Sequence, residues 1–161
     1  MNFTREALTA EGFAGWVPFA ALARADVPLQ PGVYVVTRET DNPPEFLPSS
    51  PAGRFQGKDP TVPVERLQAK WVSGATVVYI GKAAIGSRDS RGLSRRLDEY
   101  RRFGDGQSIG HRGGRYIWQL ADSADLLVAW RTTSAPEVTE SAMLEAFVAI
   151  YGRLPFANLR R

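Results

Sequence analysis

Runs and periodic patterns of apolar residues along the chain predict a domain that mixes strands and helices. Apolar runs rich in β-branched residues, which are typical of strands, lie at 33–36, 76–80 and 126–132. Helical spacing of apolar residues predicts helices at 92–103 and 136–151, with shorter ones within 1–25, at 64–71 and at 114–121. The expected fold class is α+β, with a small central three-stranded, mainly antiparallel β-sheet flanked by helices.

A long polar segment at residues 40–63 interrupts this pattern. It is rich in Pro, Gly, Ser and Asp, which makes it too polar for a core element. A loop of this length within a compact domain is usually functional or disordered. We expect one domain over 1–161, with an N-terminal helical extension at 1–29, an insertion at 40–72 and a core formed by 30–39 and 73–161.

The composition narrows the chemistry that the chain can carry. It contains no cysteine, which excludes disulfides, thiolate metal sites and a cysteine nucleophile, and its single histidine excludes a histidine-rich zinc site. No apolar run approaches the roughly 20 residues needed to span a bilayer. The N-terminus lacks the basic start and apolar stretch of a signal peptide. These features predict a cytoplasmic protein with no membrane partner.

Arginine is concentrated in one part of the sequence. The net charge of +3 is modest, but basic residues dominate between Lys82 and Arg115. The planar guanidinium group suits phosphate oxygens, so this distribution favours a nucleic-acid partner, although a solvated arginine-rich helix would look the same. His111 lies in a glycine-rich basic loop at 110–115 and is a candidate for contacting DNA or for auxiliary acid–base chemistry. The candidates for nucleic-acid binding are Arg88, Arg91, Arg95, His111, Arg112 and Arg115.

Two expected strands carry a tyrosine next to a glycine, as Gly32-Val33-Tyr34 and Tyr79-Ile80-Gly81. Each tripeptide is common by itself. The second is followed by Lys82 and then by Arg96 and Tyr100, whose spacing of four places them on one helical face. Downstream lie the helix segment 140–145, which begins and ends with glutamate, and the segment Pro155-Phe156-Ala157-Asn158.

This ordered set resembles the GIY-YIG nuclease superfamily over residues 30–160, and most closely the layout of its excision-repair nucleases. The resemblance implies a catalytic set made of Tyr34, Tyr79, Lys82, Arg96, Tyr100, Glu145 and Asn158. It also implies that one Mg²⁺ or Mn²⁺ ion binds at Glu145, that Tyr79 is the base and that Arg96 is the phosphate clamp. The chain departs from the family pattern in its longer connections between the two tyrosines and between Lys82 and Arg96.

Helix geometry provides a separate argument for Glu145. Its neighbours on a helical projection are small or apolar, which predicts a concave, lightly covered face around the carboxylate. These neighbours are Val138, Ser141, Ala142, Val148, Ala149 and Gly152. Glu140 projects elsewhere, near the helix start, where a carboxylate favourably meets the helix dipole. Ser134 and Glu137 fit a capping box for the same helix.

A hydrolytic role for these residues is chemically consistent. Mg²⁺ keeps several waters and takes ligands from a substrate phosphate, so one protein carboxylate suffices. We expect Lys82, Arg96 and the metal to favour the phenolate form of Tyr79. The predicted function is a metal-dependent endonuclease acting on DNA, with RNA as another possible substrate and with a homodimer or a partner protein for double-strand cleavage. The alternatives are a catalytically silent nucleic-acid-binding module and a protein-interaction domain that uses the 40–63 loop.

Overall fold

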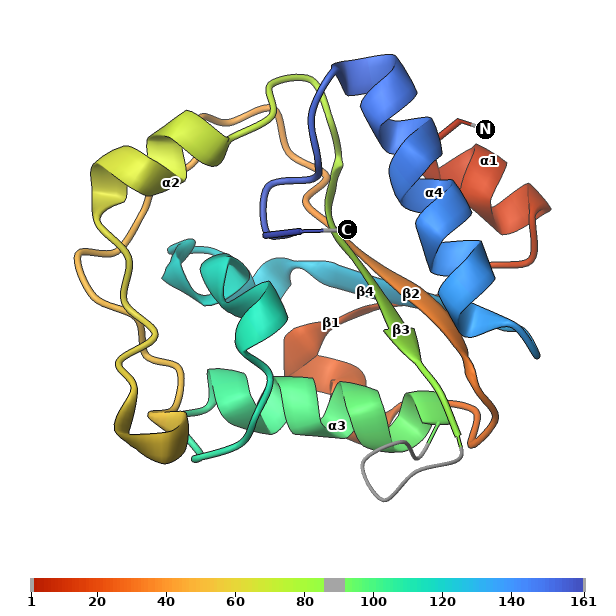
Figure 1. Ribbon diagram of the computed structural model, residues 1–161, viewed down its shortest axis with the longest axis horizontal. Coiled ribbons are helices and arrows are strands. Elements are labelled where there is room, and N and C mark those ends of the chain that lie inside the picture. Colours follow the sequence, from red (N-terminus) through yellow and green to blue (C-terminus); the bar gives the residue numbers. More distant parts are fainter. Residues whose placement is uncertain (1, 86–91, 161) are drawn as a thin grey trace.

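A computed structural model describes residues 2–85 and 92–160 of the chain (Figure 1). The helices are α1 (Arg5–Ala10), α2 (Val64–Lys70), α3 (Gly92–Gly104) and α4 (Pro136–Tyr151), and the strands are β1 (Ala14–Pro18), β2 (Gly32–Thr37), β3 (Val77–Ala83) and β4 (Leu127–Thr132). Short 3₁₀ helices, which include η1 (Phe19–Arg24) and η3 (Arg112–Gln119), connect them. Among the described helices, none combines the length and the apolar character needed to cross a membrane.

The strands form one four-stranded sheet in the order β1-β4-β2-β3, and every neighbouring pair is antiparallel. The predicted α+β class is confirmed, but the sheet has one strand more than expected. The additional strand, β1, lies in the region predicted to be helical. A register shift between Gly15 and Val17 interrupts its pairing with β4, and Gly15 and Trp16 both have positive φ. This irregularity breaks the two-residue alternation from which a strand is recognised.

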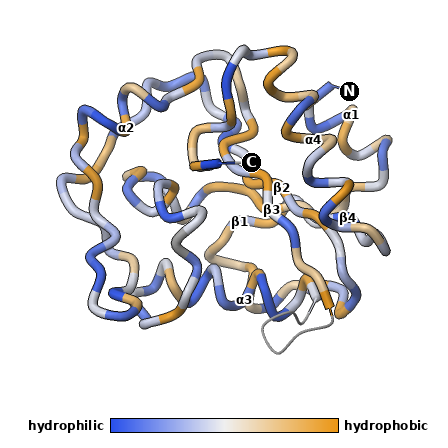
Figure 2. The backbone as a smooth tube through the Cα atoms, in the orientation of Figure 1, coloured by the Kyte–Doolittle hydropathy of each residue, from blue (hydrophilic) through white to orange (hydrophobic). Residues whose placement is uncertain are grey.

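Helices cover both faces of the sheet. Figure 1 shows α3 on one side and α4 with α1 on the other. All six residues of β2 are buried, and they alternate between the two sides. Tyr34 and Val36 belong to the hydrophobic core on the α3 side, whereas Val33 and Val35 belong to the core on the α4 side. In Figure 2 the central strands accordingly carry mostly hydrophobic colours.

The insertion at residues 40–72 is a folded part of the domain, which corrects the expectation that its residues 40–63 are too polar to contribute to the core. It contains α2, and it buries Ala52 and Val62. Gln119, which is fully buried, accepts a hydrogen bond from the Val62 amide and donates to the carbonyls of Val62 and Leu47. One buried amide side chain therefore joins two distant points of the insertion to η3.

Helix α4 begins at Pro136 as the sequence suggests, but the expected capping box does not form. The N-cap residue is Ala135, which offers no side-chain cap, and the amide of Ala135 donates instead to the hydroxyl of Thr133. At the other end, Gly152 adopts the left-handed conformation with φ 76°, which only glycine adopts readily. This turn directs residues 153–160 back along the sheet.

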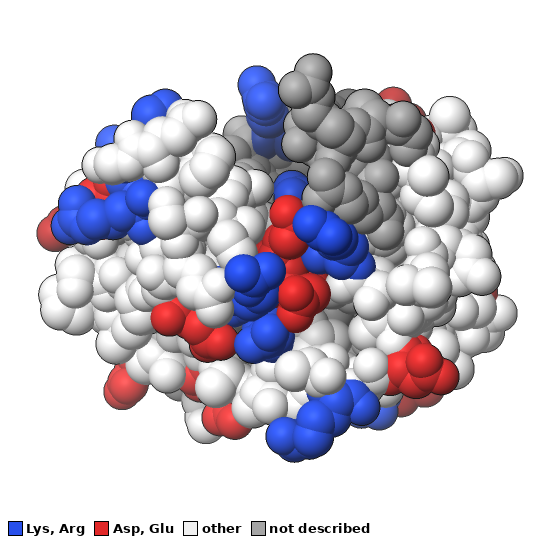
Figure 3. All heavy atoms as spheres, turned by 90° about the horizontal axis from the view of Figure 1, so that it is seen from below, with Lys and Arg blue, Asp and Glu red and all other residues white. Residues whose placement is uncertain are grey.

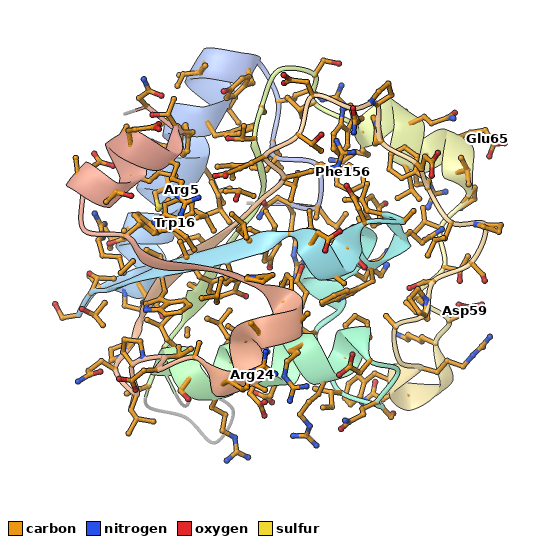
Figure 4. All side chains as sticks on the ribbon, turned by 180° about the vertical axis from the view of Figure 1, so that it is seen from behind. Arg5, Trp16, Arg24, Asp59, Glu65 and Phe156 are labelled. Carbon is orange, nitrogen blue, oxygen red and sulfur yellow. The ribbon has the colours of Figure 1, made fainter. Side chains whose placement is uncertain are left out.

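Two aromatic contacts hold the ends of the chain against the domain, and Figure 4 labels three of their residues, Arg5, Trp16 and Phe156. The guanidinium of Arg5 lies 5.1 Å from the ring centroid of Trp16, which joins α1 to β1. Phe156 packs edge-on against Trp71 with ring centroids 5.1 Å apart. The second contact fixes the C-terminal segment between the insertion and the outer edge of β3.

Candidate active site at the edge strand

Three tyrosines from three different elements meet on the α3 side of the sheet. Tyr34 comes from β2, Tyr79 from the edge strand β3 and Tyr100 from α3. Their ring centroids lie 6.0 Å apart for Tyr34 and Tyr79, 6.3 Å for Tyr34 and Tyr100, and 5.5 Å for Tyr79 and Tyr100. Tyr34 and Tyr100 are completely enclosed, whereas Tyr79 is 8% exposed. Tyr79 is thus the tyrosine of this cluster best placed to meet a ligand.

Glycines make this close packing possible. Tyr34 pairs across the sheet with Gly81, where a Cβ would lie 2.3 Å from Cζ of Tyr34. At Gly114 a Cβ would lie 2.3 Å from the hydroxyl oxygen of Tyr100. That hydroxyl donates a 2.6 Å hydrogen bond to the Gly114 carbonyl. The glycines next to the tyrosines therefore leave the space that the aromatic rings occupy.

His111 is the fourth ring of this cluster. Its side chain is 1% exposed, and its imidazole stacks on Tyr100 with centroids 3.8 Å apart and an interplanar angle of 3°. Its Nε2 lies 3.1 Å from the hydroxyl oxygen of Tyr34. So deep a position corrects the prediction that His111 contacts DNA directly, whereas the alternative of auxiliary acid–base chemistry stays a prediction. The sequence offers one signal for this position, because glycines at 110, 113 and 114 let the chain turn closely over the tyrosines.

Arg96 supplies the positive charge beside these rings. It is half-buried on α3, and its Nη1 donates a 3.5 Å hydrogen bond to the Gly110 carbonyl. Its charge lowers the pKa of each of the three tyrosines and of His111. The structure thus brings together Arg96 and Tyr100, which the sequence placed on one helical face, with Tyr34 and Tyr79.

Burial outweighs that charge at Tyr79. Desolvation raises the pKa of Tyr79 to about 12, while Arg96 lowers it and Glu140 raises it. Desolvation also raises the pKa of Tyr34 and of Tyr100 well above the ordinary value, and it lowers the pKa of His111 well below its own. Arg96 thus favours the Tyr79 phenolate, as expected, but burial outweighs its effect. In the resting site the four rings are neutral at neutral pH.

The two glutamates of α4 differ sharply in position. Glu140 is half-buried and its Oε1 lies 3.6 Å from Nζ of Lys82, which is 42% exposed. Burial raises the pKa of Glu140 and Lys82 lowers it. Glu145 is instead exposed to solvent, as are Val138, Ser141 and Ala142 beside it. The concave face predicted around Glu145 does not exist, because the small residues lie on the outer side of α4.

The ion pair and the tyrosines lie on different sides of the edge strand. Lys82 pairs with Val33, which faces α4, whereas Tyr79 pairs with Val36, which faces α3. Glu140 nevertheless acts electrostatically on both Tyr34 and Tyr79, whose pKa values it raises. The carboxylate and the phenols are thus coupled around the edge of one strand.

Asn158 holds this edge strand in place. Its side-chain carbonyl accepts from the Ile80 amide and its side-chain amide donates to the Ile80 carbonyl, both at 2.9 Å. Through these two bonds the Asn158 side chain pairs with the backbone of Ile80 as a neighbouring strand would, directly beside Tyr79. Asn158 therefore fixes the backbone of the edge strand next to Tyr79.

No protein-family model, curated protein or solved structure matches the chain.

The surface around α3 is less basic than the sequence suggests. Arg101 pairs with Asp98 and Asp105, and Arg102 also lies near Asp98. Figure 3, which views this side, shows basic and acidic side chains intermixed. Of the predicted contact arginines, Arg95 is exposed and Arg115 lies over the ring of Tyr116, while Arg88, Arg91 and the side chain of Arg112 fall outside the described residues.

Metal binding at this site would depend on one protein carboxylate. Within residues 2–85 and 92–160 no group of three or more His, Cys, Asp or Glu side chains gathers as a metal cage. The carboxylate of Glu140 has one ammonium partner, Nζ of Lys82, at 3.6 Å. Its partial burial disfavours the ionised carboxylate when no cation is bound. This donor set fits a hard divalent ion that takes its other ligands from water and substrate.

Proposed function

We propose that the protein is a metal-dependent endonuclease of the GIY-YIG type that hydrolyses phosphodiester bonds of DNA. The observation that carries the proposal is the meeting of Tyr34, Tyr79 and Tyr100 beside Arg96 at one strand edge. A half-buried guanidinium beside three buried phenols is costly for a purely structural core, because burial disfavours the charge. Strongly shifted pKa values in such clusters are typical of functional sites.

Each group has a part in this reaction that its position allows. Arg96 would donate to the non-bridging oxygens of the phosphate, and this interaction strengthens as negative charge builds in the transition state. Tyr79, the tyrosine that reaches the surface, would take the proton of the attacking water. Glu140 would hold one Mg²⁺ or Mn²⁺ ion, and the ion when bound would neutralise charge on the phosphate.

The test is nicking of a supercoiled plasmid in the presence of Mg²⁺ or of a chelator. We expect Arg96→Ala and Tyr79→Phe to slow nicking by about 100-fold or more, the usual loss for one transition-state donor or one acid–base group. Arg66→Ala is the matched control, because Arg66 is an exposed arginine on α2. If the wild type nicks DNA and Arg96→Ala nicks it equally fast, the site is assigned wrongly.

The same assay decides between the two glutamates. Glu140→Gln is expected to abolish the metal-dependent activity, since Glu140 is the carboxylate coupled to Tyr34 and Tyr79. If Glu145→Gln abolishes it and Glu140→Gln does not, the ligand is the glutamate that the family resemblance indicates. Salt-sensitive DNA binding without nicking would instead identify a silent binding module, and absence of binding at low salt would favour a protein-interaction domain.

A further inference from the structure

Two cations, Lys70 and Arg153, lie where the C-terminal segment meets the end of α2, outside the site described above. Lys70 is in the last turn of α2 and is partly exposed, and Arg153 follows α4 and is exposed. Nη2 of Arg153 donates a hydrogen bond to the carbonyl of Ala69, the residue before Lys70. Nζ of Lys70 donates in the opposite direction, at 3.4 Å, to the carbonyl of Asn158. The two side chains therefore connect α2 and the C-terminal segment from both sides.

Neither cation is neutralised by a carboxylate. Within residues 2–85 and 92–160, the ion pairs involve neither Lys70 nor Arg153. Burial and, as the smaller cause, the positive charge of Arg153 lower the pKa of Lys70. The arginines at the end of α3 differ in this respect, because Asp98 pairs with both Arg101 and Arg102. Positive charge is therefore left unbalanced beside α2 and is balanced along α3.

The hydrogen bonds to the two carbonyls do not explain why both side chains are charged. A neutral amide side chain such as glutamine donates to a carbonyl equally well. A cation is favourable at the C-terminal end of a helix, but Lys70 directs its ammonium to Asn158 and not to a carbonyl of α2. Two neighbouring cations repel each other, so a structural contact alone would favour neutral donors. The second charge is instead useful for holding an anion.

Both side chains keep donors that an anion can use. A guanidinium and an ammonium each carry several N–H donors, and the bonds to Ala69 and Asn158 occupy one on each side chain. The same bonds hold the two charged groups in place, which lowers the entropy that is lost when a ligand binds. Charge-assisted hydrogen bonds from arginine and lysine to phosphate oxygens are among the strong ones.

The pair is connected to the proposed active site through Asn158. Lys70 binds the backbone carbonyl of Asn158, whose side chain pairs with Ile80, the residue after Tyr79 in β3. Trp71, which follows Lys70, packs against the core on the α3 side, to which Tyr79 belongs. A ligand held by the two cations therefore lies beside the strand that carries the proposed base.

We propose that Lys70 and Arg153 form a subsite that binds a backbone phosphate of the nucleic-acid strand next to the one that is cleaved. The inference rests on the proposed function for the nature of the anion, because a DNA strand presents phosphates at regular intervals. The phosphate in this subsite does not react. Its contacts are equally strong in the ground state and in the transition state, so they raise affinity and position the strand without accelerating the chemical step.

The first test measures the binding of a fluorophore-labelled DNA duplex by anisotropy, with a chelator present so that no metal-dependent cleavage occurs. Lys70→Gln and Arg153→Gln remove the charges and keep a side-chain donor for each carbonyl. We expect the double variant to bind roughly tenfold more weakly, and we expect the slope of the logarithm of affinity against that of salt concentration to fall by about 1. Wild-type affinity and salt dependence in the double variant would overturn the subsite.

Two control variants separate the subsite from net charge and from stability. Arg24→Gln removes the charge of an exposed arginine of η1, which Figure 4 shows well apart from α2, and should leave binding unchanged. Lys70→Arg keeps the charge and should bind DNA as the wild type does. An equal loss of affinity in Arg24→Gln, or a loss in Lys70→Arg as large as in Lys70→Gln, would overturn the subsite. Circular dichroism establishes that each variant is folded.

The second test is the nicking assay, which distinguishes this inference from the proposed function. We expect the loss in the double variant to appear mainly in KM, whereas Arg96→Ala lowers kcat. A wild type that does not nick, with the binding difference intact, would remove the proposed function and support the subsite. Nicking with the wild-type KM in the double variant would overturn the subsite while the nuclease assignment stands.

Discussion

The ring of Tyr34 occupies the place where a side chain of Gly81 would lie. A Cβ built on Gly81 falls 2.3 Å from Cζ and 2.5 Å from the hydroxyl oxygen of Tyr34, far inside contact distance. The two residues are direct cross-strand partners in β2 and β3. The glycine of the second motif thus serves the tyrosine of the first, since its missing side chain lets that phenol approach Tyr79.

Gly81→Ala should therefore destabilise the fold and displace the site together. We expect a loss of about 1–3 kcal/mol in the free energy of unfolding, as for other overpacked cores, measured by urea denaturation. Gly113→Ala is the control, because its Cβ would meet only the Tyr79 hydroxyl at 3.7 Å, an ordinary contact. Equal losses for the two variants would contradict the packing argument.

Asn158→Ala removes both side-chain hydrogen bonds that Ile80 makes at the edge of the sheet. Each buried backbone group left unpaired costs roughly 1–3 kcal/mol, so we expect a large drop in stability. Amide hydrogen exchange at Ile80 should accelerate, because its N–H would lose its partner. Asn42→Ala, a substitution at an exposed asparagine, should change neither quantity. Unchanged exchange at Ile80 in Asn158→Ala would refute this assignment.

Glu140→Gln should leave the metal-free protein at least as stable as the wild type at neutral pH. Burial raises the pKa of Glu140 in the folded state, so between the unfolded and folded pKa values the folded protein binds more protons. Stability therefore falls as pH rises through that range, and glutamine avoids this loss. The advantage of the variant should vanish in acid, once the wild-type carboxyl is protonated. Glu145→Gln, at an exposed position of the same helix, is the matched control.

The pKa of His111 should respond to Arg96. Burial is the larger cause of its low pKa and the guanidinium of Arg96 the next, so Arg96→Ala should raise it while Arg66→Ala leaves it unchanged. In the wild type the unfolded chain binds a proton below about pH 6.5 that the folded protein does not bind. The free energy of unfolding is therefore higher above that pH and decreases as the pH falls below it. Resonance titration of the ring and urea denaturation against pH measure the two effects, and an unshifted pKa in Arg96→Ala would contradict the placement of that charge.

Local patterns in the sequence were sufficient for part of the site. Tyr34 and Tyr79 lie on strands that β-branched runs reveal, and Arg96 and Tyr100 lie four residues apart on a helix that apolar spacing reveals. Antiparallel pairing of β2 and β3 and packing of α3 then bring these residues together. The proximity of these four residues follows from the periodicity of two strands and one helix and from the pairing of the two strands in one sheet. It can therefore be predicted from the sequence.

Other parts depend on tertiary packing that a local pattern does not encode. The glycine-rich loop around His111 has no periodicity, so nothing along the chain tells whether its imidazole points to solvent or to the core. For α4, the helical projection separates the two glutamates, but the small residues around Glu145 point to the wrong face of the helix as the one that meets the sheet. The bulky residues Met143, Leu144 and Phe147 identify the buried face of α4, and Glu140 lies one helical turn before them.

The C-terminal segment has a second consequence, at the level of the whole molecule. β3 is an edge strand, and free backbone groups along such an edge are a template onto which another chain can add as a further strand. The Val78 carbonyl accepts a hydrogen bond from the amide of Ala157, and the side chain of Asn158 pairs with both the amide and the carbonyl of Ile80. The segment therefore occupies the edge of the strand that carries Tyr79 and closes that edge to other copies of the protein, which protects it from aggregation.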